Sequence, residues 1–84
     1  MLDCLIIGDS VAVGTAQARP ECVSYAKVGW NSRSWNRDYL TKASEKPAQT
    51  VIISLGANDH AGIKTESELR KMRSTIQAAR VFWI

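Results

Sequence analysis

Val51-Ile52-Ile53-Ser54-Leu55 is the stretch of the sequence that decides the fold. It is almost continuously apolar and rich in β-branched residues, whereas a strand with one face in water alternates apolar and polar side chains. This pattern favours a parallel strand that is buried on both faces. The stretch therefore predicts a central strand of a parallel sheet.

Three further short apolar segments flank this strand along the chain, and each predicts a strand: residues 2–7, 22–28 and 80–84. Between them the spacing of apolar residues becomes helical, most clearly after Thr65, and a second helix is predicted over residues 35–44. Small residues that would allow close packing on the sheet predict a further helix over residues 11–18. Strands that alternate with helices form βαβ units, in which an open parallel sheet carries helices on both faces. The sequence therefore predicts an α/β domain.

Local signals set the ends of two of these helices. Thr65 and Glu68 have the spacing of a capping box, which predicts that the third helix starts there, and Pro47 prevents the second helix from continuing. The residues expected to face the core are Trp35, Tyr39, Leu40 and Ala43 in the second helix and Leu69, Met72, Ile76 and Ala79 in the third.

Length and charge exclude several classes of function. At 84 residues the chain is one small domain, and it contains no apolar run long enough to cross a bilayer. The net charge of +3 comes from scattered Lys and Arg residues and not from a basic stripe, so nucleic-acid binding is not expected. The sequence has no phosphate-loop motif and implies no metal or organic cofactor.

The two cysteines, Cys4 and Cys22, have neither the spacing of a zinc site nor that of a CxxC redox pair. Both fall in segments predicted to be neighbouring buried strands. Reduced core cysteines in a cytosolic setting are therefore expected in preference to a disulfide.

The first apolar run is too short for a signal peptide, so the expected location is the cytoplasm or a larger assembly.

Ligands of such sheets bind beyond the carboxyl ends of the strands, where the strand order reverses. At these ends lie residues 8–14, 29–34 and 56–62. Ser10 stands at a strand-to-helix turn, where backbone N–H groups and the helix dipole favour a developing oxyanion. The alternative is that Ser10 simply caps the helix.

The other two loops offer donors for the same chemistry. Asn58 can donate an amide N–H without bringing a charge into the site, and Gly29 allows its backbone N–H to approach a substrate closely. Asn, Asp and Gly are also common turn residues, so an ordinary turn is the competing interpretation.

Gly8-Asp9-Ser10 followed by Gly14, the isolated Gly29, and Gly56-Ala57-Asn58-Asp59 resemble three of the four sequence blocks of the SGNH/GDSL hydrolases. The resemblance spans nearly the whole chain. It implies a flavodoxin-like three-layer α/β/α sandwich and hydrolysis of a carboxylic ester or a carbohydrate O-acetyl ester through an acyl-serine intermediate.

The same resemblance implies roles for individual residues. Ser10 would be the nucleophile, and its own N–H, the Gly29 N–H and the Asn58 side chain would form the oxyanion hole. Asp9 and Asp59 are expected to order their loops and not to carry protons.

The fourth block of that family, D-x-x-H, has no counterpart in residues 1–84. The expectation is therefore a partial domain that is truncated after the fourth strand and lacks the Asp–His pair that activates the serine. Either the product is truncated, or another chain supplies the rest, or the fold has been reduced. The alternative function is a non-catalytic interaction module, in which a protein partner or self-association covers the incomplete sheet.

Three further features of the sequence carry expectations of their own. His60 is a candidate substitute base, although a solvent-facing turn histidine is favoured. Trp35 is expected in the core and Trp30 beside a substrate pocket. The polar segment from Asn31 to Ser34 is a candidate for substrate contact, with a solvent-exposed loop as the competing interpretation.

Overall fold

Strands and helices alternate strictly along the computed structural model, which describes residues 2–45 and 47–84. The elements are β1 (Leu2–Gly8), α1 (Ser10–Ala18), β2 (Val23–Ala26), α2 (Ser32–Ser44), β3 (Ala48–Ser54), α3 (Thr65–Thr75) and β4 (Ala78–Trp83). Each predicted strand and helix is present, with boundaries that differ from the prediction by a few residues.

All strand pairs of the sheet are parallel, and the strand order is β2-β1-β3-β4. This order matches the first four strands of the flavodoxin-like order, which reverses direction between β1 and β3. Ile53 of β3 is paired with Ile7 on one side and Trp83 on the other. The predicted α/β class and the central position of residues 51–55 are therefore confirmed.

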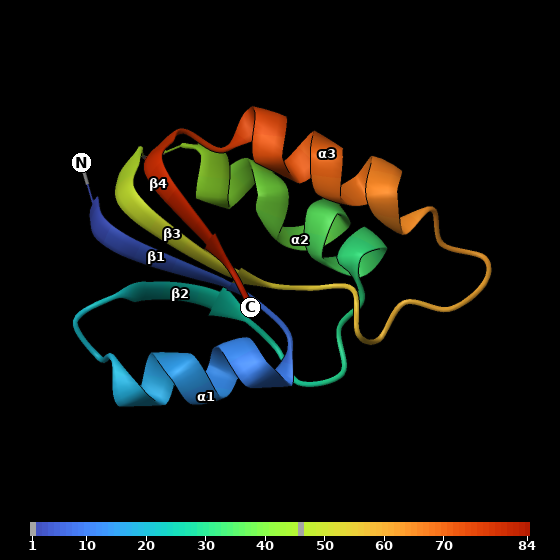
Figure 1. The fold of residues 1–84 in the computed structure, drawn as a ribbon, viewed down its shortest axis with the longest axis horizontal. Helices are drawn as coiled ribbons and strands as arrows, with labels where there is room; N and C mark the ends of the chain where they lie inside the picture. Colours follow the sequence, from blue (N-terminus) through green and yellow to red (C-terminus); the bar gives the residue numbers. More distant parts are fainter. Residues whose placement is uncertain (1, 46) are drawn as a thin grey trace.

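The sheet lies between two helical layers. In Figure 1, α1 covers one face, while α2 and α3 lie side by side on the other. The main core fills the space between the sheet and the α2–α3 layer; its fully buried side chains include Leu5, Ile7, Trp35, Val51 and Met72. The three layers agree with the expected α/β/α sandwich.

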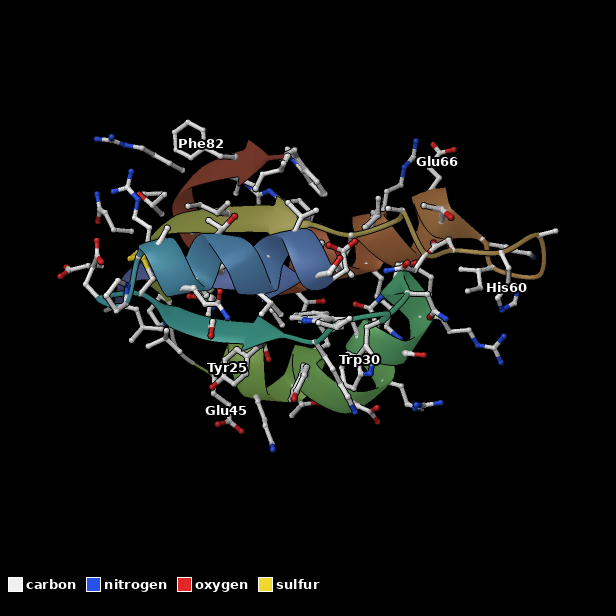
Figure 2. The ribbon with its side chains drawn as sticks, turned by 90° about the horizontal axis from the view of Figure 1, so that it is seen from below. Tyr25, Trp30, Glu45, His60, Glu66 and Phe82 are labelled. Carbon is white, nitrogen blue, oxygen red and sulfur yellow. A yellow bond between two sulfur atoms is a disulfide. The ribbon has the colours of Figure 1, made fainter. Side chains whose placement is uncertain are left out.

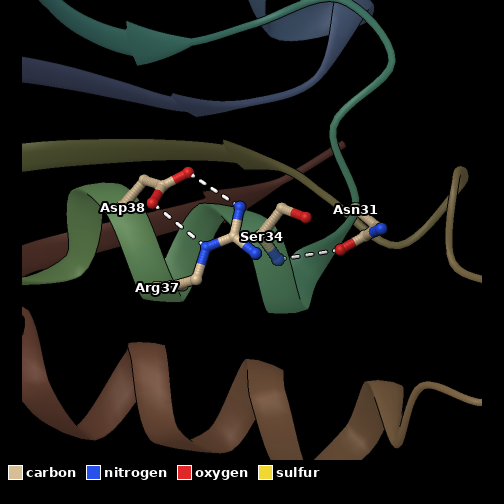
Figure 3. Close-up of polar contacts among 4 residues, drawn as sticks. All are labelled: Asn31, Ser34, Arg37 and Asp38. Atoms are coloured by element: carbon tan, nitrogen blue, oxygen red, sulfur yellow. Dashed lines mark hydrogen bonds and ion pairs between the residues drawn. The ribbon is translucent and has the colours of Figure 1, made fainter.

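The start of α2 corrects the prediction for residues 31–34. Asn31 is the N-cap, because its side-chain oxygen accepts a hydrogen bond from the Ser34 N–H at 2.8 Å (Figure 3). Ser32 is fully buried. This segment is the capped first turn of a helix and not an exposed loop.

The start and end of α3 also differ from the prediction. Lys64 occupies the N-cap position without a side-chain hydrogen bond, and the Thr65 hydroxyl donates to Asp59 instead of closing a capping box. The helix ends at Thr75, so Ile76 and Ala79 do not extend its buried stripe. Ile76 is nevertheless buried, because the backbone turns there into β4.

The prediction of reduced cysteines is wrong, because Cys4 and Cys22 form a disulfide. The register of the sheet explains the pairing. Leu5 of β1 is paired with Val23 of β2, and each cysteine directly precedes one of these residues. The two Cα atoms are therefore 4.9 Å apart, within the range that a disulfide requires.

The strand β4 and the residue that follows it carry exposed apolar side chains. Phe82 and Trp83 are each about half exposed (55% and 51%), and Ile84 is 65% exposed. The helix α1 packs on β1 and β2 and reaches β3, so it leaves β4 uncovered on the sheet face that α1 occupies.

Among the residues that the structure describes, no helix combines the length and apolarity needed to span a membrane.

Candidate functional site

The predicted site lies at the carboxyl ends of β1 and β3, where the strand order reverses. The two strands come very close there. Gly8 has a φ of +145°, and a Cβ at this position would stand 1.9 Å from the carbonyl oxygen of Ser54. The same carbonyl accepts a hydrogen bond from the Asp9 N–H at 3.0 Å. Gly8 thus allows the loop with Ser10 to start directly beside the end of β3.

Asp9 orders the turn between β1 and α1. Its carboxylate is buried and accepts hydrogen bonds from the Val11 N–H at 3.1 Å and from the Ser54 hydroxyl at 3.2 Å. The first of these bonds makes Asp9 the N-cap of α1. This contact agrees with the expectation that Asp9 orders its loop.

Ser10 is the first residue of α1 and is exposed. The interpretation of Ser10 as the helix cap is wrong, because Asp9 takes that role. Ser10 therefore stands at the positive end of the helix dipole without serving as the cap.

Gly29 lies in a turn that is attached to the end of β1. The Lys27 N–H donates to the Gly8 carbonyl at 3.0 Å, and the Trp30 N–H donates to the Lys27 carbonyl at 3.3 Å. Gly29 has a φ of +81°, which a residue with a side chain adopts only with strain. Apart from its two chain neighbours, no heavy atom of the described residues lies within 4 Å of where its Cβ would be, so the space beside it is open.

Asn58 is exposed and joins the loop after β3 to the loop after β2. Its side-chain amide donates to the Trp30 carbonyl at 3.0 Å. It lies in a turn closed by the Asp59 N–H and the Gly56 carbonyl, at 3.1 Å. A primary amide has two N–H donors, so this bond orients the group and leaves a second donor free.

Asp59 follows Asn58 in the chain and connects the start of α2 to the start of α3. Its carboxylate accepts from the Ser32 N–H at 2.8 Å, from the Ser32 hydroxyl at 2.6 Å and from the Thr65 hydroxyl. Partial burial opposes ionisation, but these hydrogen bonds and the nearby His60 outweigh it, so the pKa of Asp59 is below its ordinary value. The contacts agree with a loop-ordering role.

His60 lies on the exposed outer stretch of the same loop (Figure 2). Its Nδ1 accepts a hydrogen bond from the Gly62 N–H at 3.2 Å, so the neutral ring carries its proton on Nε2. Nδ1 is the basic nitrogen of that tautomer, and it is already engaged. His60 is thus a turn residue, as the favoured interpretation had it.

Trp30, which precedes α2, and Trp35, which lies in α2, have different environments. Trp35 is fully buried, and its Nε1–H donates to the Tyr25 carbonyl at 2.8 Å, which confirms its place in the core. Trp30 is partly buried and packs on Tyr39 with ring centroids 4.7 Å apart, while the Lys27 ammonium lies 5.2 Å from its ring centroid. Trp30 therefore joins the core to the site loops.

Backbone hydrogen bonds bring the three predicted loops to one edge of the sheet, but the sequence did not identify the side chains that hold these loops. Ser54 bonds to Asp9, and both Ser32 and Thr65 bond to Asp59. The sequence does carry one signal for Ser54, because it is a serine within an otherwise apolar strand.

Across residues 2–45 and 47–84, no three His, Cys, Asp or Glu side chains are grouped as metal ligands.

A surface hollow of about 540 Å³ lies at the start of α3. It is lined by Lys64, Thr65, Glu66, Ser67 and Arg70. These residues do not include Ser10, Gly29 or Asn58. The hollow therefore does not mark the predicted site.

The chain is similar to a phosphatidylcholine-sterol acyltransferase of Aeromonas hydrophila, with 36% identity over 74 residues. The match covers 76% of this chain and 22% of the relative, so the chain spans about a fifth of that protein's length. No protein-family model matches the chain, and no solved structure matches it. The similarity to the acyltransferase is consistent with the resemblance to the SGNH/GDSL hydrolases.

Proposed function

We propose that this chain is the nucleophile-bearing part of a serine acyl-transfer enzyme of the SGNH/GDSL type, with Ser10 as the nucleophile. The observation that carries the proposal is that Asp9, and not Ser10, serves as the N-cap of α1. Asp9 caps α1, and Ser10 remains exposed at the same helix terminus. The similarity to an acyltransferase supports the same chemistry.

In the proposed reaction the Ser10 hydroxyl oxygen attacks the carbonyl carbon of an ester. The N–H groups of Ser10 and Gly29 and the free amide N–H of Asn58 stabilise the oxyanion that forms. The alkoxide of the ester leaves with a proton, and water or a second alcohol then takes the acyl group from Ser10. The substrate class is a carboxylic ester, which includes carbohydrate O-acetyl esters and acyl lipids.

The proton of the Ser10 hydroxyl requires a base. The engaged Nδ1 of His60 argues against that residue, and the D-x-x-H block that supplies the base in the SGNH/GDSL family is absent from this sequence. A base from outside these residues is therefore part of the proposal. Free imidazole can stand in for such a base in solution.

The test is covalent labelling with a fluorophosphonate, with and without added imidazole, followed by mapping of the modified residue. We expect imidazole-dependent labelling of Ser10 that is lost in Ser10→Ala and retained in His60→Ala. Ser67→Ala, at an exposed serine on α3, is the matched control. A folded chain whose Ser10 stays unlabelled in imidazole would contradict the proposal.

The exposed residues of β4 favour a second candidate function, an interaction module that binds a strand of another chain. An open strand edge with Phe82, Trp83 and Ile84 exposed offers both backbone hydrogen bonds and apolar area. Self-association through this edge is the simplest form. Light scattering at increasing concentration tests it, and a monomer throughout would count against self-association.

We also propose that the chain works in an oxidising compartment and not in the cytoplasm. The Cys4–Cys22 disulfide supports this location, because cytosolic reductants keep most thiols reduced. Thiol trapping in intact cells tests it. Two alkylated cysteines on the trapped protein would contradict this location.

A further inference from the structure

The carboxylate of Asp59 connects two helices that are far apart in sequence. Oδ1 accepts from the Ser32 N–H, and Oδ2 accepts from the hydroxyls of Ser32 and Thr65. Ser32 is the first residue of α2, and Thr65 is the first residue of α3. The loop after β3 is thereby fastened to both helix N-termini, where a negative charge is favourable.

The same two segments are joined a second time by the neighbouring residue. Asn58 donates to the Trp30 carbonyl, two residues before Ser32. Residues 58 and 59 are thus bonded to residues 30 and 32, which fixes the register between the two loops. Asn31 does not compete for the partners of Asp59, because its side chain bonds to the Ser34 N–H within its own turn (Figure 3).

The orientation of Asn58 depends on these anchors. Its side chain is exposed, and Trp30 supplies its hydrogen-bond acceptor. Gly56, on the other side of the turn, has a φ of +112° and offers no side chain that could hold the loop. If the bonds to Asp59 are lost, the Asp59–Gly56 turn bond and the Asn58–Trp30 bond are the ones among the described residues that still hold the residues next to the amide.

We propose that Asp59 is a positioning residue that aims the Asn58 amide, through its bonds to Ser32 and Thr65, at the point where the oxyanion forms. The proposal rests on the proposed function for its catalytic consequence. Its geometric part, that Asp59 fixes Asn58 against Trp30, stands independently of catalysis.

The geometric part is tested by following the side-chain amide of Asn58 by nitrogen-edited NMR, with the resonance assigned from its loss in Asn58→Ala. We expect the amide to move toward its free-chain position in Asp59→Ala and less far in Thr65→Val, which removes one donor with little change of shape. Asp38→Ala is the matched control, because Asp38 is an exposed carboxylate on α2 that pairs with Arg37. It should leave the resonance in place.

The catalytic part is tested by the rate of imidazole-dependent labelling of Ser10. We expect a loss of about 10- to 100-fold in Asp59→Ala and no change in Asp38→Ala, since displacement of one oxyanion donor costs up to about 1,000-fold. An amide resonance that stays in place in a folded Asp59→Ala would overturn the positioning role. If Asp59→Ala does not fold, Thr65→Val decides by the same criterion.

The failure of this inference is distinguishable from that of the proposed function. If Ser10 is never labelled while the Asn58 resonance moves, the function is wrong and the positioning of Asn58 holds. If Ser10 is labelled at an unchanged rate in a variant whose Asn58 resonance has moved, the catalytic part of the inference is wrong.

Discussion

The carbonyl oxygen of Ser54 occupies the space that a side chain at Gly8 would need, 1.9 Å from the ideal Cβ position. The positive φ of Gly8, +145°, adds backbone strain for any other residue. Because Asp9 follows Gly8 and is bonded to Ser54, a displacement here would also move the start of α1.

We therefore expect Gly8→Ala to lower the free energy of unfolding by about 3 kcal/mol or more, since strain at such a position and the loss of a cap act together. Gly14→Ala is the control within the neighbouring helix. Outside its own helix backbone and its chain neighbours, no heavy atom of the described residues lies within 4 Å of the Cβ position of Gly14, so this substitution should stabilise the protein by about 1 kcal/mol. Urea denaturation measures both. A Gly8→Ala protein as stable as Gly14→Ala would refute the close approach of β1 and β3.

Replacement of Asn58 separates reactivity from stability. Its amide is exposed and has one hydrogen bond to Trp30, so Asn58→Ala should cost about 1 kcal/mol or less of stability. Loss of an oxyanion donor should slow labelling of Ser10 by about 100- to 1,000-fold. Asn36→Ala is a contrasting control, because Asn36 is buried between α2 and α3 and bonds to the Glu68 carbonyl. It should affect stability more than labelling; equal labelling rates in Asn58→Ala and the parent would rule out Asn58 as a donor.

The lowered pKa of Asp59 predicts a specific dependence of stability on pH. Burial works against ionisation, but the bonds from Ser32 and Thr65 outweigh it, and the pKa falls below the ordinary value of 3.8. A carboxylate whose pKa is lower in the folded state contributes stability above its unfolded pKa and loses it as pH falls through the folded pKa. The loss should begin below about pH 5.

In Asp59→Asn this contribution is absent at every pH. Its stability deficit relative to the parent should therefore shrink as the pH falls from about 7 toward 3. Urea denaturation across that range measures the difference between the two proteins. A deficit that is constant over the whole range would contradict the lowered pKa.

The Cys4–Cys22 disulfide should stabilise the fold because it restricts the conformations of the unfolded chain. The cysteines are 18 residues apart, and closing a loop of that size is worth about 3 kcal/mol. Thermal unfolding with and without reductant should show this loss, while Cys22→Ser should be insensitive to reductant. Thiol titration of the unreduced, denatured protein should find no free thiol, and two thiols there would contradict the bond.

Most of the fold could be predicted from the sequence because its signals are local. The apolar run of residues 51–55 and the helical spacing of Trp35, Leu40 and Ala43 depend on burial, which the structure confirms. The expectation for Thr65 was wrong because Thr65 is the first residue of the helix and not its cap. In a capping box its hydroxyl would accept from the Glu68 N–H, but that N–H donates to the Lys64 carbonyl at 3.0 Å, and the Thr65 hydroxyl donates to the Asp59 carboxylate.

The disulfide was missed for a different reason. The spacing of two cysteines carries no information on their distance until the strand register is known, and here Leu5 and Val23 set it. The link between Asp59 and Ser32 likewise joins residues 27 positions apart. Ser10, Gly29 and Asn58 could be placed on their loops from the sequence, whereas the groups that hold those loops could not.

The capping of α1 by Asp9 makes position 10 a useful place for a chemical handle. Cys4 and Cys22 are bonded to each other, so a cysteine introduced by Ser10→Cys would be the one free thiol among residues 2–45 and 47–84. The substitution keeps the cap and places the thiol at a helix N-terminus, where thiolates form readily. A fluorophore or spin label attached there would report directly on whatever approaches this edge of the sheet.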